Sequence, residues 1–368
     1  MTKKIETIVV GGGAMGSSTA WNLARRGREV VLLEQFAQGH HNGASHGATR
    51  NFSIAYAQDD YHAMIVESTR LWAELGDAFG SPLLDVVGTT NHGYVDTSTN
   101  EWLNAHGIAV EMLSVDAAAE RWPGIRFDTQ VQYFEGGGRV RAADALVALH
   151  SQIVAHGGEV RFDTPVLTLT VRPDGLVEVV TAGESYLATT AVVTVGAWTN
   201  KLLGGVLRTP ELVVTQEQPA HFAQLDESIT WPSFNHAPLP GNAAYDYWYS
   251  GVYGMLTPGE GIKAGWHGTG PVVDPDNRSF EPEAVQLAAL QQYARDWLPG
   301  VDADDFAAIS CTYTTSPDSN FVLDRVGPIV VGAGFSGHGF KFTPSVGRIL
   351  ADLADGTSEA PAIFSAQR

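Results

Sequence analysis

The chain has 368 residues, 44% of them hydrophobic and 17% charged, so it is long enough for two globular domains with sizeable cores. Asp and Glu number 41 against 22 Lys and Arg, and the net charge of -19 argues against nucleic acid and anionic membranes as partners. Cys311 is the only cysteine, which excludes an intrachain disulfide and fits a reducing compartment. The apolar runs are too short for a membrane span or a signal peptide, so we expect a cytoplasmic protein.

The first 34 residues have the pattern of a dinucleotide-binding unit. The predicted elements are a strand at 5–10, a helix at 14–26 and a second strand at 29–33. Gly11, Gly13 and Gly16 stand between the first strand and the helix with the spacing G-x-G-x-x-G, and Glu34 follows the second strand. The glycine spacing alone is weak evidence, but the strand before it, the helix after it and the acid about 20 residues on make it strong.

Each part of this unit has a physical role in binding a nucleotide. Gly11 would make the tight turn, Gly13 would let the backbone approach a pyrophosphate, and Gly16 would let the helix pack closely on the strand. The N-terminus of the helix would offer free N–H groups and its positive dipole to the phosphates. The Glu34 carboxylate would accept hydrogen bonds from a ribose.

Beyond residue 34, strands and helices alternate until about residue 210, and aromatic strands broken by Gly and Pro follow. Helices are predicted at 60–76, 102–107, 114–122, 142–156, 281–297 and 346–353. Strands are predicted at 83–95 with a turn inside, and at 130–135, 159–162, 166–172, 176–181, 186–188, 191–195 and 327–332. We expect two discontinuous domains. Residues 1–85, 141–210 and 319–368 would form an α/β domain, and residues 86–140 and 211–318 an antiparallel-sheet domain that covers it.

Six motifs follow one another in an order that resembles a known family. They are GGGAMG at 11–16, SHGATR at 45–50, GAW at 196–198, IKAGWH at 262–267, SCTYTTSPD at 310–318 and GAGFSGHGFKF at 332–342. Together they resemble the monomeric sarcosine oxidase and N-methyltryptophan oxidase family of FAD-dependent amine oxidases, which includes bacterial fructosyl-amino acid oxidases. The resemblance implies an α/β, Rossmann-like FAD-binding domain of the glycine-oxidase and glutathione-reductase type. Beside it we expect an α+β substrate domain with a large, mostly antiparallel sheet.

The resemblance also implies an activity. An enzyme of this family oxidises the secondary amine of an N-substituted amino acid to an imine, which water hydrolyses to an aldehyde or osone and the free amino acid. O2 is reduced to hydrogen peroxide. The implied partners are a small amine substrate and O2, and the implied assembly is a monomer.

The resemblance assigns a set of residues to FAD. They are Gly11, Gly13, Ala14, Met15, Gly16, Glu34, Gln35, Ser45, His46, Thr49, Arg50, Val166, Gly196, Trp198, Cys311, Gly334, Gly337, His338, Gly339 and Lys341. Cys311 matches the family cysteine that carries the flavin through a thioether, so we expect covalent FAD. Taken by itself, a lone cysteine is usually a small buried hydrophobe.

Five residues are expected to act on substrate or oxygen by the same resemblance. Lys263 would activate O2, because a desolvated cation stabilises the negative charge that develops on oxygen. His267, four residues on, and Tyr253 would line the substrate pocket, Arg50 would lie close to the flavin ring, and Lys341 would pair with the substrate carboxylate.

The sequence departs from the family at Ser53, where sarcosine oxidases carry a second Arg that shares the substrate carboxylate. A neutral Ser cannot replace that charge-assisted contact, so the carboxylate is held differently or the substrate differs. An aromatic cluster either packs the sheet or stacks on a larger substrate group; it comprises Tyr245, Tyr247, Trp248, Tyr249, Tyr253 and Trp266. The sequence leaves open a small N-methyl amino acid, such as sarcosine, and a fructosyl-amino acid.

Three other interpretations fit less well. Residues 43–47 match the G-x-S-x-G of hydrolases, but the strand directly before and the helix directly after are missing from the pattern. His40, His41 and His46 lack an accompanying carboxylate or cysteine at metal-ligand spacing, so we predict no metal site. An NAD-dependent dehydrogenase would share the glycine motif but has no use for Cys311 or the motif at 332–342.

Overall fold

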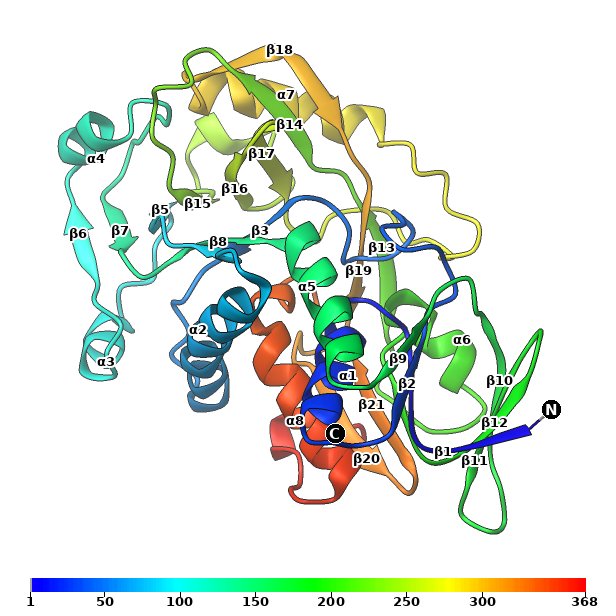
Figure 1. The fold of residues 1–368 in the computed structure, drawn as a ribbon. Coiled ribbons are helices and arrows are strands. Elements are labelled where there is room, and N and C mark those ends of the chain that lie inside the picture. Colours follow the sequence, from blue (N-terminus) through cyan, green and yellow to red (C-terminus); the bar gives the residue numbers. More distant parts are fainter. Residues whose placement is uncertain (1) are drawn as a thin grey trace.

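The computed structural model describes residues 2–368, and its larger half is built on a parallel sheet (Figure 1). Five strands run parallel in the order β21-β12-β1-β2-β9. Their bounds are β1 Thr2–Val10, β2 Val30–Leu33, β9 Glu159–Arg161, β12 Ser185–Val193 and β21 Ile329–Ala333. Three antiparallel strands extend this sheet: β10 Val166–Val171 and β11 Val177–Thr181 beside β12, and β20 Val322–Val326 beside β21.

Alternation of apolar side chains lets both faces of the parallel sheet pack. Val9, Leu32 and Val330 point into a core shared with the helices on one face, whereas Ile8 and Val31 point into a second core on the other face. The helices of the first face are α1 Ala14–Arg25, α2 Asp59–Phe79, α5 Ala142–Ala155 and α8 Thr343–Asp355. A short helix, α6 Thr199–Leu203, contributes to the second core.

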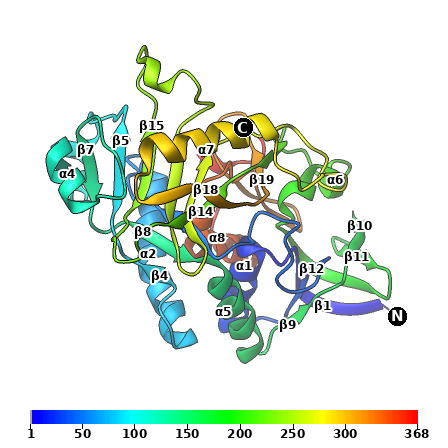
Figure 2. The same cartoon turned by 90° about the horizontal axis from the view of Figure 1, so that it is seen from above.

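The second large sheet is almost entirely antiparallel. Its order is β18-β14-β17-β16-β15-β5-β7-β6, and only the β5–β15 pair is parallel. The bounds are β5 Thr89–Gly93, β6 Glu111–Leu113, β7 Val131–Phe134, β14 Ala220–Gln224, β15 Ser233–Ala237, β16 Val252–Thr257, β17 Gly261–Trp266 and β18 Val301–Ala308. Helix α7, Ala284–Trp297, lies across the outer face of this sheet, as Figure 2 shows from above. The inner face is therefore turned toward the parallel-sheet half.

Small sheets and short helices join the two halves. One small sheet comprises β3 Thr49–Phe52, β4 Leu84–Asp85 and β8 Gly138–Arg141, and another comprises β13 Val213–Glu217 and β19 Cys311–Thr315. The short helices are α3 Asn100–Ala105, α4 Val115–Arg121, η1 Gly196–Trp198, η2 Ala243–Tyr245, η3 Phe340–Phe342 and η4 Ala362–Phe364. The side chains of Thr49 and Thr257 share a hydrogen bond of 2.6 Å, which ties β3 to β16.

The expected fold class is confirmed, with some differences in individual elements. Residues 186–188 and 191–195, predicted as two strands, belong mainly to the single strand β12, whose first half pairs with β11 and whose second half pairs with β21. Helix α8 begins three residues earlier than predicted. The domain division stays a prediction, and each large sheet is drawn from segments of one expected domain. Among residues 2–368, no helix combines the length and apolar character needed to cross a membrane.

Candidate active site

A cavity of about 1650 Å³ separates the carboxyl ends of the parallel strands from the inner face of the antiparallel sheet. Val10, Leu33 and Thr194 line it from the parallel-sheet side, and Tyr253 and Lys263 line it from the other. Ligands of open α/β sheets bind at this end of the strands. All the expected site residues except Gly16 and Gly334 line this cavity.

The glycine-rich turn has the tight geometry that its spacing predicts. Gly11 has a φ of 102°, and a Cβ there would lie 2.5 Å from the Thr194 carbonyl oxygen. Gly16 lies outside the cavity because it packs the helix on the turn: a Cβ there would lie 1.9 Å from the Gly11 carbonyl oxygen. The N–H of Ala14, expected to face a phosphate, donates to the Ser45 hydroxyl at 2.9 Å. Ser45 therefore fixes the loop after β2 against the N-terminus of α1.

Glu34 is a buried carboxylate at one end of the cavity. It accepts hydrogen bonds from the N–H of Gly12 at 2.7 Å and of Phe36 at 3.0 Å, and His40 lies 3.4 Å away. Burial raises the pKa of Glu34, but the His40 contact and the two N–H groups outweigh it, so its pKa lies below the ordinary value. The carboxylate is thus charged and aligned, with further lone pairs free to accept from a ribose.

The other expected residues at this end lie along the cavity wall. Trp198 packs its ring 5.6 Å from Phe36 and donates to Asp276 at 2.6 Å. The remaining members that line the cavity here are Gln35, Val166 and Gly196.

Arg50 and Cys311 meet at the Ala44 carbonyl. Arg50 donates to Ala44 at 2.9 Å, to Thr49 at 2.8 Å and also to His46, all through backbone carbonyls. The Cys311 thiol lies 3.9 Å from the same Ala44 oxygen. No carboxylate within residues 2–368 pairs with Arg50, so its positive charge stays available to the cavity.

His46 is held neutral beside Arg50. Burial lowers its pKa to about 3, and the charge of Arg50 acts in the same direction. Its Nε2 atom is buried and has no hydrogen-bond partner within the described chain. An orphaned buried ring nitrogen costs about 1–3 kcal/mol, so a bound group that hydrogen-bonds there would relieve the cost.

Lys263 lies on β17 with only 4% of its surface exposed. Burial lowers its pKa to about 7, and the positive charge of Arg50 adds to the effect. It forms no hydrogen bond or ion pair with any of residues 2–368. The amine therefore lines the cavity without a partner in the described chain, and its pKa lies well below the ordinary value of a lysine because of its burial.

Tyr253, His267 and Tyr313 form an aromatic wall near Lys263. The His267 ring lies 6.4 Å from Tyr253 and 5.3 Å from Tyr313, whose hydroxyl is 3.5 Å from the His267 Nδ1. Burial lowers the pKa of His267 and raises the pKa of Tyr253. Tyr313 was not predicted as a site residue, although it stands in the motif at 310–318. Its signal is the two-residue offset from Cys311, which puts both side chains on one face of β19.

Lys341 is buried and connected to a chain of hydrogen bonds. It is 7% exposed and donates to the Tyr56 hydroxyl and to the His338 carbonyl, both at 3.1 Å. The His338 Nε2 lies 3.1 Å from the Ser319 carbonyl, so this nitrogen donates and Nδ1 accepts from Tyr56 at 3.3 Å. Two of the three ammonium protons are thereby engaged, and the third is free for an anion. Burial lowers the pKa of Lys341 to about 7.

Gly337 and Gly339, which the resemblance assigns to FAD, leave room for protein side chains. A Cβ at Gly337 would lie 2.2 Å from the Tyr313 ring, and one at Gly339 would lie 2.6 Å from Phe335. Gly334 lies behind this loop and accepts a hydrogen bond from the Ser336 hydroxyl at 3.0 Å.

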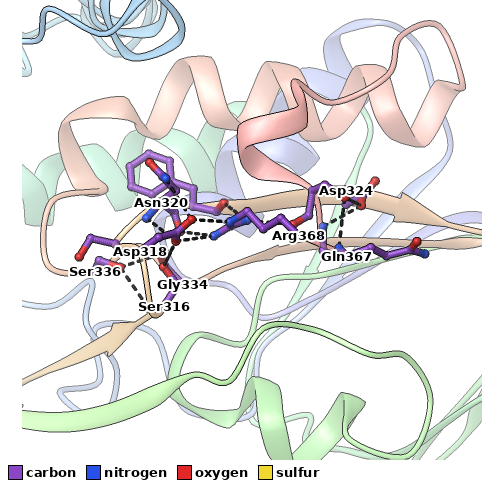
Figure 3. Close-up of polar contacts among 12 residues, drawn as sticks. Ser316, Asp318, Asn320, Asp324, Gly334, Ser336, Gln367 and Arg368 are labelled. Carbon is purple, nitrogen blue, oxygen red and sulfur yellow. Dashed lines mark hydrogen bonds and ion pairs between the residues drawn. The ribbon is translucent and has the colours of Figure 1, made fainter.

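A polar network braces the same loop from behind, as Figure 3 shows. Arg368 binds both carboxylate oxygens of Asp318, at 2.8 and 3.0 Å. The Ser316 hydroxyl donates to Asp318, and the Ser316 N–H donates to the Ser336 hydroxyl at 3.3 Å. Ser316 thereby connects the Arg368–Asp318 pair to the loop.

The aromatic cluster divides between the two faces of the antiparallel sheet. Only Tyr253 lines the cavity; Tyr245, Tyr247, Trp248 and Trp266 belong to the core beneath α7, and Tyr249 is 43% exposed. The Trp248 ring, for example, lies 5.0 Å from Tyr293 of α7. Of the two alternatives that the sequence left open, sheet packing therefore holds for Tyr245, Tyr247, Trp248 and Trp266, and only Tyr253 is in a position to contact a substrate.

One cavity thus contains the dinucleotide-binding turn and two buried lysines, Lys263 and Lys341. This combination is typical of an oxidoreductase that binds a nucleotide cofactor. The chain belongs to the DAO family of FAD-dependent oxidoreductases, whose family model matches residues 6–353. It is 31% identical to the monomeric sarcosine oxidase of Bacillus sp. (strain NS-129), over 100% of this chain and 98% of that protein. It is 33% identical to the probable sarcosine oxidase of Arabidopsis thaliana, over 95% of this chain and 88% of that protein.

The solved structures agree with the sequence relatives. The structure of NikD, described as an unusual amino acid oxidase essential for nikkomycin biosynthesis, superposes with a TM-score of 0.87 at 27% identity. The match covers 99% of this chain and 98% of NikD. The resemblance read from the six motifs is therefore confirmed at the level of the family.

FAD is the cofactor of this family, and the residues present fit it. Glu34 and the glycine-rich turn at one end of the cavity suit a ribose and a pyrophosphate. Arg50, which has no ion-pair partner in the described chain, and the orphaned Nε2 of His46 suit the polar edge of a large ring system. Cys311 lies beside them.

Proposed function

We propose that this protein is an FAD-dependent oxidase of the secondary amine of N-substituted amino acids. The observation that carries the proposal is the pair of buried lysines, Lys263 and Lys341, in the same cavity as the dinucleotide turn. One cation suits the reduction of O2 and the other suits a substrate carboxylate. The sarcosine oxidase relatives support the same reaction.

The products follow from the chemistry of the amine. FAD, when bound, would supply the redox chemistry, namely the two-electron oxidation of the carbon next to the amine nitrogen coupled to reduction of O2 to hydrogen peroxide. The amine becomes an imine, and water hydrolyses the imine to an aldehyde or ketone and the free amino acid. The protein contributes orientation and charge.

Lys263 is proposed as the residue that serves O2. Its ammonium lies in a buried setting where a positive charge stabilises developing negative charge on oxygen far more than it would in water. With a pKa of about 7, it can also hold or release a proton at neutral pH.

Lys341 is proposed to pair with the substrate carboxylate. Two of its protons are held by Tyr56 and the His338 carbonyl, so its third is aimed rather than free to rotate. A charge-assisted hydrogen bond in a closed pocket is stronger than its surface counterpart. His267 and Tyr253 would then flank the amine and orient it.

Cys311 is proposed to hold FAD covalently. Its thiol is 9% exposed, lines the cavity and lies against the same carbonyl that binds Arg50. A thiol on the cavity wall next to Arg50 shares the space that a bound ring system would occupy, which supports the proposal.

We further propose that the enzyme acts as a monomer in the cytoplasm. The monomer is supported by the name of the bacterial relative, and the compartment by the single cysteine, which fits a reducing environment.

A second candidate is a narrower one, a fructosyl-amino acid oxidase. Ser53 lines the cavity and supplies neither the bulk nor the charge of an arginine. A Ser53→Arg variant tests this candidate: it should leave turnover of sarcosine similar or improved and lower turnover of a fructosyl-amino acid, because the long side chain fills the cavity.

The proposed function is tested by peroxide release from purified holoenzyme. The panel is sarcosine, N-methyltryptophan, proline, fructosyl-valine and fructosyl-lysine, each under air. Peroxide with at least one of these secondary amines, together with equimolar aldehyde, ketone or cyclic imine, is the expected result. Absence of peroxide with all of them, while the flavin remains bound and oxidised, would contradict the proposal.

A further inference from the structure

A chain of side-chain amides runs along the inner face of the antiparallel sheet. Asn51 donates to Asn235 at 3.0 Å, Asn235 to Asn91 at 2.9 Å and Asn91 to Gln132 at 3.1 Å. Gln132 in turn donates to Asn100. The first four of these residues line the cavity.

The register of the sheet places this amide row beside the proposed reaction centre. Gln132 is opposite Asn91, Asn91 is opposite Asn235, and Asn235 is opposite Tyr253. Residues opposite one another on neighbouring strands share a face of the sheet. The amides therefore extend from Tyr253 along one wall of the cavity toward α3.

Each internal amide of the row has bonding capacity left over. A side-chain amide has two N–H donors and two acceptor lone pairs. Asn235 and Asn91 each use one donor and one acceptor within the row, so each keeps one N–H and one lone pair. Both side chains are only partly buried, whereas Gln132 is 3% exposed and anchors the end. Asn51 adds an oxygen that is buried without a partner within residues 2–368.

This leftover pattern matches a hydroxyl group. A hydroxyl both donates and accepts, so it satisfies the spare lone pair and the spare N–H of neighbouring amides together. An apolar substituent on the row would remove water from these polar groups and leave them without hydrogen-bond partners, which is unfavourable. The row carries no net charge, so it would leave the charge of a second carboxylate or of an ammonium unpaired, whereas a neutral hydroxyl needs no counter-charge.

We propose that Asn51, Asn91 and Asn235 form a subsite for a hydroxylated substituent on the amine of the substrate. The proposal rests on the proposed function, because it assigns the substituent of that amine. The substituent would be an N-alkyl group with several hydroxyls, such as a polyol or a sugar-derived chain. Gln132 is a positioning residue that fixes the orientation of Asn91.

The test uses binding, so that it does not depend on turnover. The probes are two thioethers, (2,3-dihydroxypropylthio)acetate and (2-methylbutylthio)acetate, which have matched shapes and differ in two hydroxyls against two methyls. Sulfur replaces the amine, so neither can be oxidised as an amine. Calorimetry on the holoenzyme gives the Kd of each, and the ratio of the two Kd values is the readout.

The variants are Asn91→Leu, which removes both hydrogen bonds of the central amide, and Asn91→Ser, which retains one hydroxyl. Gln224→Leu is the matched control, because Gln224 lies on β14 of the same sheet and outside the cavity. Flavin absorbance and the melting temperature verify that each variant is folded. If Asn91→Leu loses its flavin, Asn91→Ser carries the test.

The wild-type protein and the Gln224→Leu control should bind the dihydroxy probe more tightly than the methyl probe. Asn91→Leu should shift the ratio of the two Kd values about tenfold toward the methyl probe. Asn91→Ser should shift it less. Tenfold corresponds to one lost hydrogen bond. A wild-type preference for the methyl probe, or an unchanged ratio in both Asn91 variants, would overturn the subsite. Failure of the proposed function has a different signature, namely no peroxide from any secondary amine.

Discussion

At the scale of single residues, Cys311 gives the most direct prediction. It is the only thiol, it lines the cavity, and it lies beside Arg50 at the Ala44 carbonyl. Protein precipitated with acid should therefore stay yellow, and a peptide containing Cys311 should carry the mass of the flavin. The Cys311→Ser variant should release all of its flavin into the supernatant. A colourless wild-type precipitate would contradict the covalent bond and leave the fold untouched.

Lys263 should separate the two half-reactions. Its amine makes no hydrogen bond with the described chain, so replacement by Met removes a charge and little packing. Lys263→Met should slow reoxidation of the reduced enzyme by O2 about a thousandfold, which corresponds to about 4 kcal/mol of lost stabilisation. Anaerobic reduction by substrate should change much less. Stopped-flow measurements of both steps decide the matter, and equal slowing of the two would count against the assigned role.

Lys341 should make anion binding depend on pH. Burial lowers its pKa to about 7, so the ammonium is present below that pH and lost above it. The Kd of methylthioacetate, which has no titrating amine, should rise up to about tenfold per pH unit above 7. Loss of the side chain in Lys341→Ala should weaken binding by about 2–4 kcal/mol and flatten the profile.

Lys263 supplies the control for this pH profile, because burial lowers its pKa to about 7 as well. The slope should persist in Lys263→Met and vanish in Lys341→Ala. If the slope vanished in Lys263→Met and persisted in Lys341→Ala, the carboxylate would bind to Lys263 and the proposed role of Lys341 would be wrong.

At the scale of elements, the loop at 316–320 depends on Arg368. The guanidinium binds both oxygens of Asp318 and also donates to three backbone carbonyls, of Phe321, Ser365 and Asn320. Arg368→Ala should lower the free energy of unfolding by about 1–2 kcal/mol, because it removes several charge-assisted bonds, though water screens the exposed carboxylate.

Arg172→Ala is the matched control for that loop. Arg172 pairs with Asp174 at 3.2 Å in an exposed hairpin, and such pairs contribute little. Chemical denaturation of both variants should give a clear loss for Arg368 and a change within about 0.5 kcal/mol for Arg172. Equal losses would mean that the network in Figure 3 is no stronger than a surface pair.

Sequence reasoning identified the elements whose signal is local. The turn at Gly11 was predictable because only a residue without a side chain fits a φ of 102° against Thr194. The continuous strand β12 was not predicted, because Thr189 and Thr190 interrupt the apolar run, although Thr190 still pairs with Thr7 of β1. Thr is β-branched and favours strands, so the backbone continues through these two polar residues without a break.

The site divides in the same way between local and long-range information. Lys263, Lys341 and Cys311 stand in recognisable motifs, and the structure brings them to one cavity. Tyr56 and the amide row have no motif. Asn91 and Asn235 meet only because β5 pairs in parallel with β15 across more than a hundred residues, a register that nothing in either strand announces.

At the scale of the whole molecule, the two halves enclose a cavity much larger than a substrate alone would need. The walls carry Glu34, whose carboxylate keeps lone pairs beyond its bonds to Gly12 and Phe36, and Arg50, which has no ion-pair partner within the described chain. The Nε2 atom of His46 is buried there without a hydrogen-bond partner among residues 2–368. The fold and the cofactor are therefore expected to be thermodynamically linked, since a ligand that binds only the folded state stabilises it.

Removal of FAD tests that linkage. Cys311→Ser should allow FAD to be stripped by dialysis against high salt at low pH, and the stripped protein should unfold several degrees earlier than the same variant with FAD restored. At a free FAD concentration about 100 times its Kd, the expected stabilisation is about 2.7 kcal/mol. Scanning calorimetry at several FAD concentrations should give a melting temperature that rises with concentration. A melting temperature independent of FAD would contradict the linkage. It would mean that protein contacts alone, such as the Thr49–Thr257 hydrogen bond, hold the two halves together.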